Sequence, residues 1–207
     1  MPVYSKKEEL INIVSHLLGA VLAVAGFILL TVKASATGNI AKISSSVIYG
    51  LSLIELYTVS TVYHATKNQK NRKYTQKFDH LSVNILITGC NIAFLVGGLQ
   101  STLGYSLTGV VLFLSLVSII FNSINVKKYR ALTMTCYILT GWMAIFVFNP
   151  LQASIGDGVW LVLAGGFFYM TGLIFYAVHK EFMHSIWHFF VLVGSIIHFF
   201  AVYFYIL

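Results

Sequence analysis

The sequence predicts an all-α fold, a polytopic membrane protein whose seven transmembrane helices form a single domain over residues 1–207. The chain is 58% hydrophobic and only 9% charged, whereas an average soluble domain carries about a quarter charged residues. Apolar runs of about 20 residues, the length that crosses a hydrocarbon core of about 30 Å, recur along the whole chain. A water-soluble globule is therefore excluded, and we expect a multi-pass protein of the cell membrane.

Seven segments have the length and hydrophobicity of a membrane span. They cover residues 13–32, 44–63, 81–99, 103–124, 132–148, 159–178 and 185–207. The boundary between the third and fourth segments is the least marked, because only nearby glycines and the polar stretch Gln100-Ser101-Thr102 punctuate it. A count of six spans follows if the chain does not turn there.

The first helix is expected to begin before the membrane. Ser5, followed three residues later by Glu8, has the pattern of a capping box, which starts a helix. The alternative of a cleaved signal peptide is disfavoured, because the apolar core of a signal peptide has about 7 to 15 residues and this run is longer.

The basic residues between the spans predict the orientation. If seven segments cross, one side carries only Lys33 and Lys42. The other side carries Lys6, Lys7, Lys67, Lys70, Arg72, Lys73, Lys77, Lys127, Lys128, Arg130 and Lys180. The positive-inside rule then places the N-terminus in the cytoplasm and the C-terminus outside. The net charge of +7 is thus explained by topology, and no nucleic-acid partner is expected.

Polar and ionisable side chains within the spans indicate where a functional site lies, because such groups are costly in a bilayer and usually face the interior of a bundle. They are His16, Glu55, Ser60, His64, Asp79, His80, His184, His188 and His198. The predicted topology brings the ends of the first, second, third and seventh spans to the cytoplasmic leaflet. Most of these residues lie near those four ends, which is the convergence that one buried site requires.

The spacing of these residues places them on shared helix faces. His184 and His188 are four residues apart, so both imidazoles project from one side of a helix, as two ligands of one metal do. Ser60 and His64 repeat that spacing on the second span. A third group shares one face of the first helix and is expected to contribute to binding the cofactor: Glu9, Asn12 and His16.

Three histidines without a cysteine match a catalytic zinc site, in which water takes the open fourth position. We therefore expect His64, His184 and His188 to bind zinc. Asp79 is expected to act as general base or to orient the water, and Ser60 to donate a hydrogen bond near the metal or to polarise a substrate carbonyl. In the alternative interpretation His184 and His188 form an interfacial packing pair, and Glu9 and Asn12 are solvated polar residues at the start of the first helix. The role of Glu55 stays open in both interpretations.

These motifs resemble those of the hemolysin III family, the bacterial branch of the progestin and adiponectin receptor superfamily. The resemblance rests on three ordered motifs and covers nearly the whole chain: Glu9-x-x-Asn12-x-x-x-His16, Ser60-x-x-x-His64 with Asp79 downstream, and His184-x-x-x-His188. It implies a seven-helix bundle in a bacterial plasma membrane, with zinc held by the three histidines on the cytoplasmic side and with Asp79 and Ser60 nearby.

One segment departs from the family pattern. Family members commonly carry a Gly-Thr-Tyr-Thr-Pro-Phe-like stretch after the aspartate, whereas this chain has Gly89-Cys90-Asn91-Ile92-Ala93-Phe94. The missing proline is expected to remove a kink from the third helix and so to alter the shape of the cavity.

Three functions are compatible with the motifs and the resemblance. The first is a zinc-dependent hydrolase acting on an amide or ester of a membrane lipid, because relatives in the receptor branch are linked to lipid amide hydrolysis. The second is a membrane-perturbing hemolysin, although few charged groups are available to line a channel. The third is a receptor for the lipid state with structural zinc. All three have membrane lipids as partners, and a zinc transporter is disfavoured because the ligands cluster at one leaflet.

Overall fold

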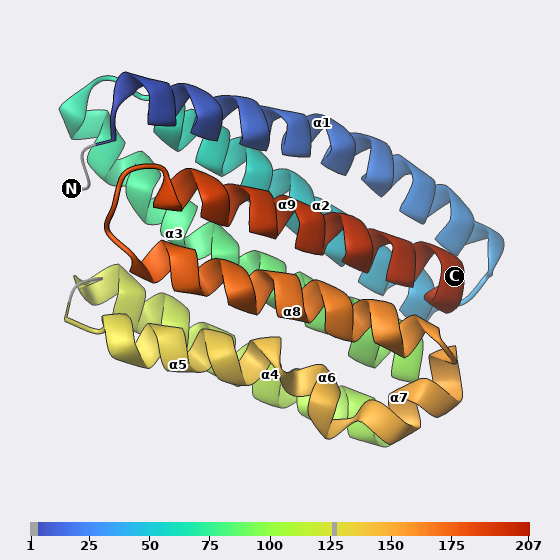
Figure 1. Cartoon of the computed structure of the whole chain (residues 1–207). Coiled ribbons are helices and arrows are strands. Elements are labelled where there is room, and N and C mark those ends of the chain that lie inside the picture. Colours follow the sequence, from blue (N-terminus) through green and yellow to red (C-terminus); the bar gives the residue numbers. More distant parts are fainter. Residues whose placement is uncertain (1–3, 126–127) are drawn as a thin grey trace.

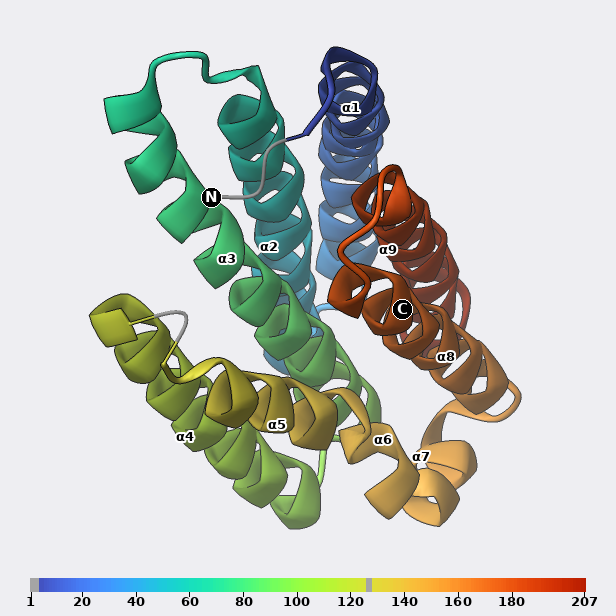
Figure 2. The same ribbon diagram turned by 60° about the vertical axis from the view of Figure 1, so that its left-hand side comes forward.

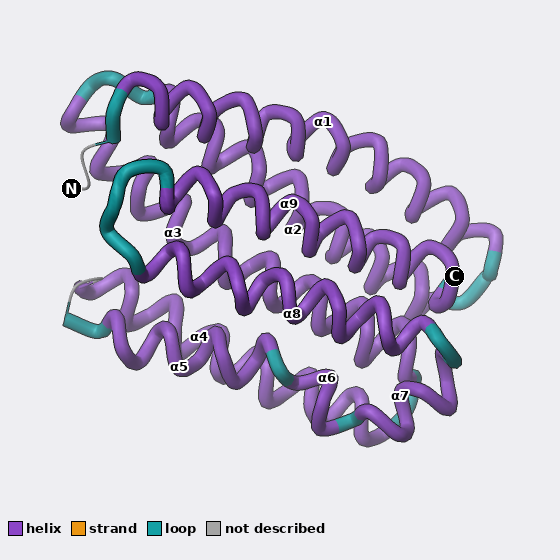
Figure 3. The backbone as a smooth tube through the Cα atoms, in the orientation of Figure 1, coloured by secondary structure: helices purple, strands orange, loops and turns teal. Residues whose placement is uncertain are grey.

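The computed structural model describes residues 4–125 and 128–207, so Lys127, one of the basic residues counted above, lies outside it. The described chain is an elongated bundle of roughly parallel helices joined by short loops (Figures 1 and 3), and no strand occurs in it. The helices are α1 (Lys6–Ala36), α2 (Ile40–Ala65), α3 (Gln69–Ile92), α4 (Thr102–Asn125), α5 (Arg130–Gly141), α6 (Met143–Phe146), α7 (Phe148–Ile155), α8 (Gly158–Ala177) and α9 (Met183–Ala201). Two π-helical segments, Ala93–Leu99 and Val202–Ile206, extend α3 and α9.

Successive long helices run in opposite directions, and the two termini lie at opposite ends of the bundle (Figure 1). Helix α1 packs against α2 and α9, α2 also packs against α3, and α8 packs against α9 (Figure 2). Helix α4 pairs with α5 on the far side of α3. The end of α2 and the starts of α1, α3 and α9 therefore meet at the end of the bundle that carries the N-terminus.

The expected start of the first helix is confirmed. The Ser5 hydroxyl accepts the Glu8 backbone N–H at 3.3 Å, and the Glu8 carboxylate accepts the Ser5 N–H at 2.9 Å. These two bonds satisfy backbone donors that the first turn of a helix leaves free.

Within residues 4–125 and 128–207, six helical stretches are long and apolar enough to cross a membrane, in keeping with a multi-pass membrane protein. The third and fourth are separate, because Gln100 adopts a left-handed conformation (φ 45°) between Leu99 and Thr102. The predicted fifth segment, 132–148, is not one continuous helix: it breaks at Trp142 and at Val147 into α5, α6 and the start of α7. Pro150 explains the later break, because proline lacks the backbone N–H of a helix interior and is tolerated in the first turn of a new helix.

The third helix leaves α-helical geometry even though the family proline is absent. Residues Ala93–Leu99 form a π-helix, and most of their side chains are buried. The absence of the proline therefore does not make the third helix regular throughout, and the removal of a kink stays a prediction. A π-helical segment widens the backbone locally and is often found beside functional sites, and Phe94 in this segment lines the apolar cavity described below.

Small residues allow the helices to approach closely inside the bundle. Gly19 of α1 lies directly against the ring of Tyr57 of α2, so that a Cβ atom at this position would overlap the ring. Tyr57 is fully buried and its hydroxyl donates to Ser195 Oγ at 2.7 Å, which fixes the ring in place. Gly109 of α4, by contrast, has open space around it.

We expect Gly19→Ala to lower the free energy of unfolding by about 1–3 kcal/mol, because the added methyl group must displace a fixed ring. Gly109→Ala is the matched control and is expected to stabilise the protein by about 0.5–1 kcal/mol through helix propensity. Thermal unfolding of the purified protein in detergent measures both. Equal melting temperatures for the two variants would contradict the packing described here.

Candidate metal centre

Three histidines from two helices converge at the N-terminal end of the bundle. His64 lies at the end of α2, and His184 and His188 lie in the first two turns of α9. Their ligating nitrogens all lie within 4.8 Å of one another. The Nε2 atom of His184 is 3.3 Å from Nε2 of His64 and 3.1 Å from Nε2 of His188. The three residues expected from the sequence to bind a metal therefore form one group that can hold a metal ion.

Helix α1 holds the ring of His64 in place. The Nδ1–H of His64 donates to the Glu9 carboxylate at 2.7 Å, and the other carboxylate oxygen of Glu9 pairs with Arg72 of α3. Because an ionised carboxylate only accepts hydrogen bonds, the ring proton is on Nδ1 and the lone pair is on Nε2. This carboxylate–histidine arrangement is the one that orients histidine ligands in metal sites.

A second chain of hydrogen bonds from α1 reaches His188. Nδ1 of His188 lies 3.4 Å from the Ser15 hydroxyl, which donates in turn to the Asn12 carbonyl at 3.1 Å. The Asn12 side chain accepts a hydrogen bond from the Ser185 hydroxyl at 2.7 Å. Asn12, Ser15, Ser185 and His188 are all buried. The geometry places a proton on Nδ1 of His188 and leaves its Nε2 free, as in His64.

The start of α9 is itself tied to α1. Phe182 adopts a left-handed conformation (φ 64°) just before the helix, and its backbone N–H donates to Glu8 Oε1 at 2.6 Å. Glu8 thus caps α1 with one oxygen and fixes the start of α9 with the other. This contact sets the position of His184, which lies two residues further along the chain.

The donor set fits a transition metal. The Nε2 atom of His184 lies 3.1–3.3 Å from the Nε2 atoms of His64 and His188, and nitrogen lone pairs held this close repel one another unless a proton or a cation lies between them. Imidazole nitrogens suit zinc, copper, iron and nickel, and three histidines with an open position are typical of catalytic zinc sites. Within the described residues, this is the one group of three such side chains with converging ligand atoms.

The remaining residues singled out in the sequence surround this centre without joining the group. The His16 ring stacks on the His188 ring with centroids 3.5 Å apart, and neither of its nitrogens has a hydrogen-bond partner in residues 4–125 and 128–207. Ser60, one turn before His64, is buried with its hydroxyl unpartnered among the same residues. Asp79 is also buried. Glu9 and Asn12 belong to the hydrogen-bonded groups around His64 and His188 that are described above.

Several contacts of the site could not be found from motif spacing. From the sequence, Arg72 was expected only to help set the topology, and Glu8 only to cap the first helix. Ser15 and Ser185 belong to none of the motifs. Tyr4 was also missed: its ring stacks on His184 with centroids 4.8 Å apart and covers the outer side of the centre. Burial, together with the neighbouring phenols of Tyr63 and Tyr176, raises the pKa of Tyr4 above its ordinary value, so the phenol is neutral.

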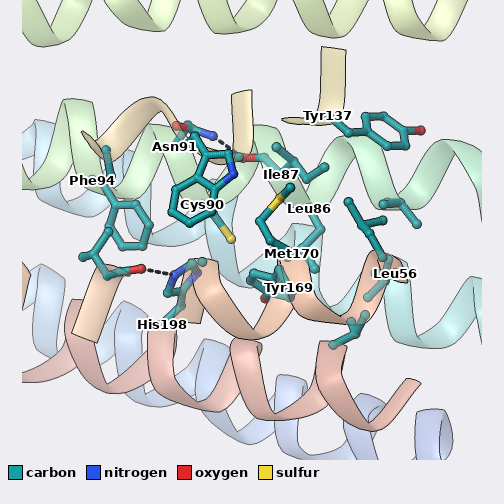
Figure 4. Close-up of a pocket in the computed structure, with 18 of the residues that line it drawn as sticks. Leu56, Leu86, Ile87, Cys90, Asn91, Phe94, Tyr137, Tyr169, Met170 and His198 are labelled. Atoms are coloured by element: carbon teal, nitrogen blue, oxygen red, sulfur yellow. Dashed lines mark hydrogen bonds between the residues drawn. The ribbon is translucent and has the colours of Figure 1, made fainter. Parts of the chain in front are cut away.

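One cavity adjoins the centre, and a second cavity shares part of its lining. The vestibule, of about 1140 Å³, lies beside the centre at the N-terminal end of the bundle and is lined by Tyr4, Asp79, His184 and many polar residues. The apolar cavity, a narrow space of about 80 Å³, is lined almost entirely by hydrophobic side chains (Figure 4). His198 also lines it, and its Nε2–H donates to the Val162 carbonyl at 2.9 Å. Asp79 lines both cavities.

Comparison with known proteins agrees with this geometry. The profile of the family described as "Haemolysin-III related" matches residues 4–199. The chain belongs to this family. It is 37% identical to "Hemolysin-3" of Bacillus cereus over 203 residues, which cover 97% of this chain and 93% of the relative. It is also 37% identical to the "Hemolysin-3 homolog" of Bacillus subtilis (strain 168), over 98% of this chain and 96% of the relative.

A more distant similarity extends beyond bacteria. The chain is 24% identical to the human "Monocyte to macrophage differentiation factor" over 166 residues, which cover 77% of this chain and 69% of the relative. This similarity is consistent with the superfamily that the motifs suggested. The match to the haemolysin-III-related family covers residues 4–199, which include all three histidines of the centre.

We expect Glu9→Gln to weaken metal binding about 10–100-fold, because loss of the carboxylate that orients a ligating histidine has an effect of this size. Competition with a chromogenic chelator measures the affinity of the purified protein for zinc. Asp157→Asn, in the turn between α7 and α8, is the control and should bind as the unmodified protein does. Unchanged affinity in Glu9→Gln would contradict the role assigned to this carboxylate.

Proposed function

We propose that this haemolysin-III-related protein is a zinc-dependent hydrolase that cleaves an amide or ester bond of a membrane lipid. The observation that carries the proposal is the convergence of three histidines, one of which, His184, lines the same polar cavity as the buried carboxylate of Asp79. Asp79 also lines the apolar cavity. Zinc bound by three histidines lowers the pKa of the water in its open position to about 7, which supplies hydroxide at neutral pH.

The residues around the centre have distinct parts in this proposal. His64, His184 and His188 bind the metal, and Glu9 keeps the proton of His64 on Nδ1 so that Nε2 is free to bind. Asp79 accepts the proton of the attacking water and passes it to the leaving group. The unpartnered hydroxyl of Ser60 donates to the carbonyl oxygen of the substrate. The burial of both groups supports these roles, because water competes less for them.

The proposal includes the seven-span topology with a cytoplasmic N-terminus. The start of α1 and the end of α9 lie at opposite ends of the bundle (Figure 1), which supports an odd number of crossings. The broken segment formed by α5, α6 and α7 runs from one end of the bundle to the other and supplies the seventh crossing. Ten basic residues of the described chain then lie on the side of the histidines, which the positive-inside rule assigns to the cytoplasm.

We expect Asp79→Asn to retain about one zinc per chain and to lose at least about 100-fold in kcat, since general acid–base catalysis contributes factors of this size. His188→Ala is expected to lose both zinc and turnover. Elemental analysis of purified protein gives the metal content. Mass spectrometry of fluorescent N-acyl and O-acyl lipids incubated with the protein gives turnover, with Asp157→Asn as the control.

Three results would count against the proposal. Turnover that persists after the zinc is removed by a chelator would show that the metal has no part in the reaction. Zinc bound at one per chain without turnover of any lipid, together with a fall in melting temperature on chelation, would support a receptor with a structural metal instead. Release of dye from liposomes that is unaffected by His64→Ala would favour a membrane-perturbing protein.

A further inference from the structure

The vestibule carries a cluster of basic side chains that the proposed chemistry does not use. Lys73 and Lys77 come from α3, Arg130 is the first residue of α5, and Lys180 lies in the loop before α9. These three elements are far apart in the sequence, but all of them reach the same cavity at the N-terminal end of the bundle (Figure 2). The cavity therefore gathers positive charge from separate parts of the chain.

These cations lack ionic partners. Across residues 4–125 and 128–207, every ion pair involves Glu9, whose partners are His64 and Arg72. The guanidinium of Arg130 lies over the ring of Tyr176, 5.8 Å from its centre, which orients the group but does not neutralise it.

The acidic residues that line the vestibule do not balance this charge. The Glu8 carboxylate already accepts the backbone N–H groups of Ser5 and Phe182. Asp79 is buried at the junction with the apolar cavity, and only Glu181 remains beside Lys180. Four cations around a partly enclosed space create a positive potential, which an anion within the space relieves.

The vestibule continues into the apolar cavity. Asp79, Val83, Tyr137, Leu173 and Trp187 line both. Beyond this junction the lining is hydrophobic, with Leu86, Phe94 and Val191 among its members (Figure 4). A molecule that occupies both spaces must therefore have an anionic part and an apolar part.

We infer that the vestibule binds the anionic group, a phosphate or a carboxylate, of an amphiphile whose apolar part enters the apolar cavity. Lys73, Lys77 and Arg130 contact the anion, because lysine and arginine form charge-assisted hydrogen bonds with both groups. The inference rests on the proposed function in one respect, since it names the substrate class of that hydrolase. A zwitterionic head group would leave the positive potential only partly compensated.

An alternative explanation for these basic residues is membrane topology alone, because the positive-inside rule places lysine and arginine on the cytoplasmic side whether or not they bind a ligand. Lys67 and Lys70 provide the comparison. They are as exposed as Lys73 and Lys77 and belong to the same stretch of chain, but they do not line the vestibule. If removing charge at Lys73 and Lys77 weakens binding more than removing it at Lys67 and Lys70, the vestibule is a binding site. An equal loss at both pairs would indicate a general attraction to anionic lipid.

Binding to the full chain in phosphatidylcholine nanodiscs tests the inference, with intrinsic tryptophan fluorescence as the signal. The probes are lysophosphatidic acid, a fatty acid, lysophosphatidylcholine and inorganic phosphate. We expect the double variant Lys73→Gln/Lys77→Gln to bind the two anionic amphiphiles at least about tenfold more weakly, since each charge-assisted hydrogen bond contributes about 1.5–3 kcal/mol. Lys67→Gln/Lys70→Gln should change binding less than about twofold, and Arg130→Gln should resemble the first double variant.

Three results would overturn the inference: an equal loss in both double variants, lysophosphatidylcholine bound as tightly as lysophosphatidic acid, or inorganic phosphate bound as tightly as the amphiphiles. The last result would mean that the site takes a free anion. Melting temperatures exclude unfolding as the cause of any loss.

This experiment is separate from the test of catalysis, because it measures binding alone. Charge-dependent binding by a protein that hydrolyses no lipid would leave this inference standing and remove the proposed function. Hydrolysis of zwitterionic lipids with no charge-dependent binding would support the proposed function and remove this inference.

Discussion

The hydrogen bond between Glu9 and His64 joins the first two helices at the end of the bundle where the other functional groups gather. Polar groups placed among apolar helices are costly unless they find partners, and here α1 supplies the partners. It orients His64 through Glu9, His188 through Ser15, and the start of α9 through Glu8. None of these residues of α1 needs to touch a metal. The helix acts as a scaffold that fixes the protons of two imidazoles on Nδ1 and turns their Nε2 atoms toward a common point.

The need to hold the three histidines together constrains how α1, α2 and α9 pack against one another. Helices α1, α2 and α9 must stay in close register for the nitrogens to meet, and the close contact of Gly19 with Tyr57 together with the Tyr57–Ser195 hydrogen bond joins these three helices. The opposite side of the bundle, formed by α4 to α7, does not contribute to the metal centre and is more irregular. There the chain breaks at Trp142 and Val147, and its residues line the two cavities instead. Helices α1, α2 and α9 thus hold the metal ligands and their partners, and α3, α5 and α8 supply much of the cavity lining.

Much of this organisation could be predicted from the sequence, because hydrophobic length and helical spacing are local properties. The spans, the capping box at Ser5 and the His184–His188 pair depend only on residues close together in the chain. The partners of those residues could not be predicted in the same way. Whether Arg72 reaches Glu9, or Ser15 reaches His188, depends on how each helix is rotated about its axis in the bundle. The π-helix at Ala93–Leu99 and the break at Trp142 were also hidden, since no proline lies within either. The boundary that carried the weakest signal, at Gln100, proved to be a sharp turn.

The central claim is that three imidazoles at the N-terminal end of the bundle bind one metal ion. X-ray absorption spectroscopy at the zinc edge of the purified protein, without added metal, tests this most directly. The account predicts one zinc per chain with three nitrogen ligands at about 2.0–2.1 Å, one oxygen ligand, and the multiple-scattering pattern of imidazole. A spectrum with sulfur ligands, or with six oxygen ligands and no imidazole signal, would contradict the account. So would protein that contains no metal and takes none up when zinc is supplied.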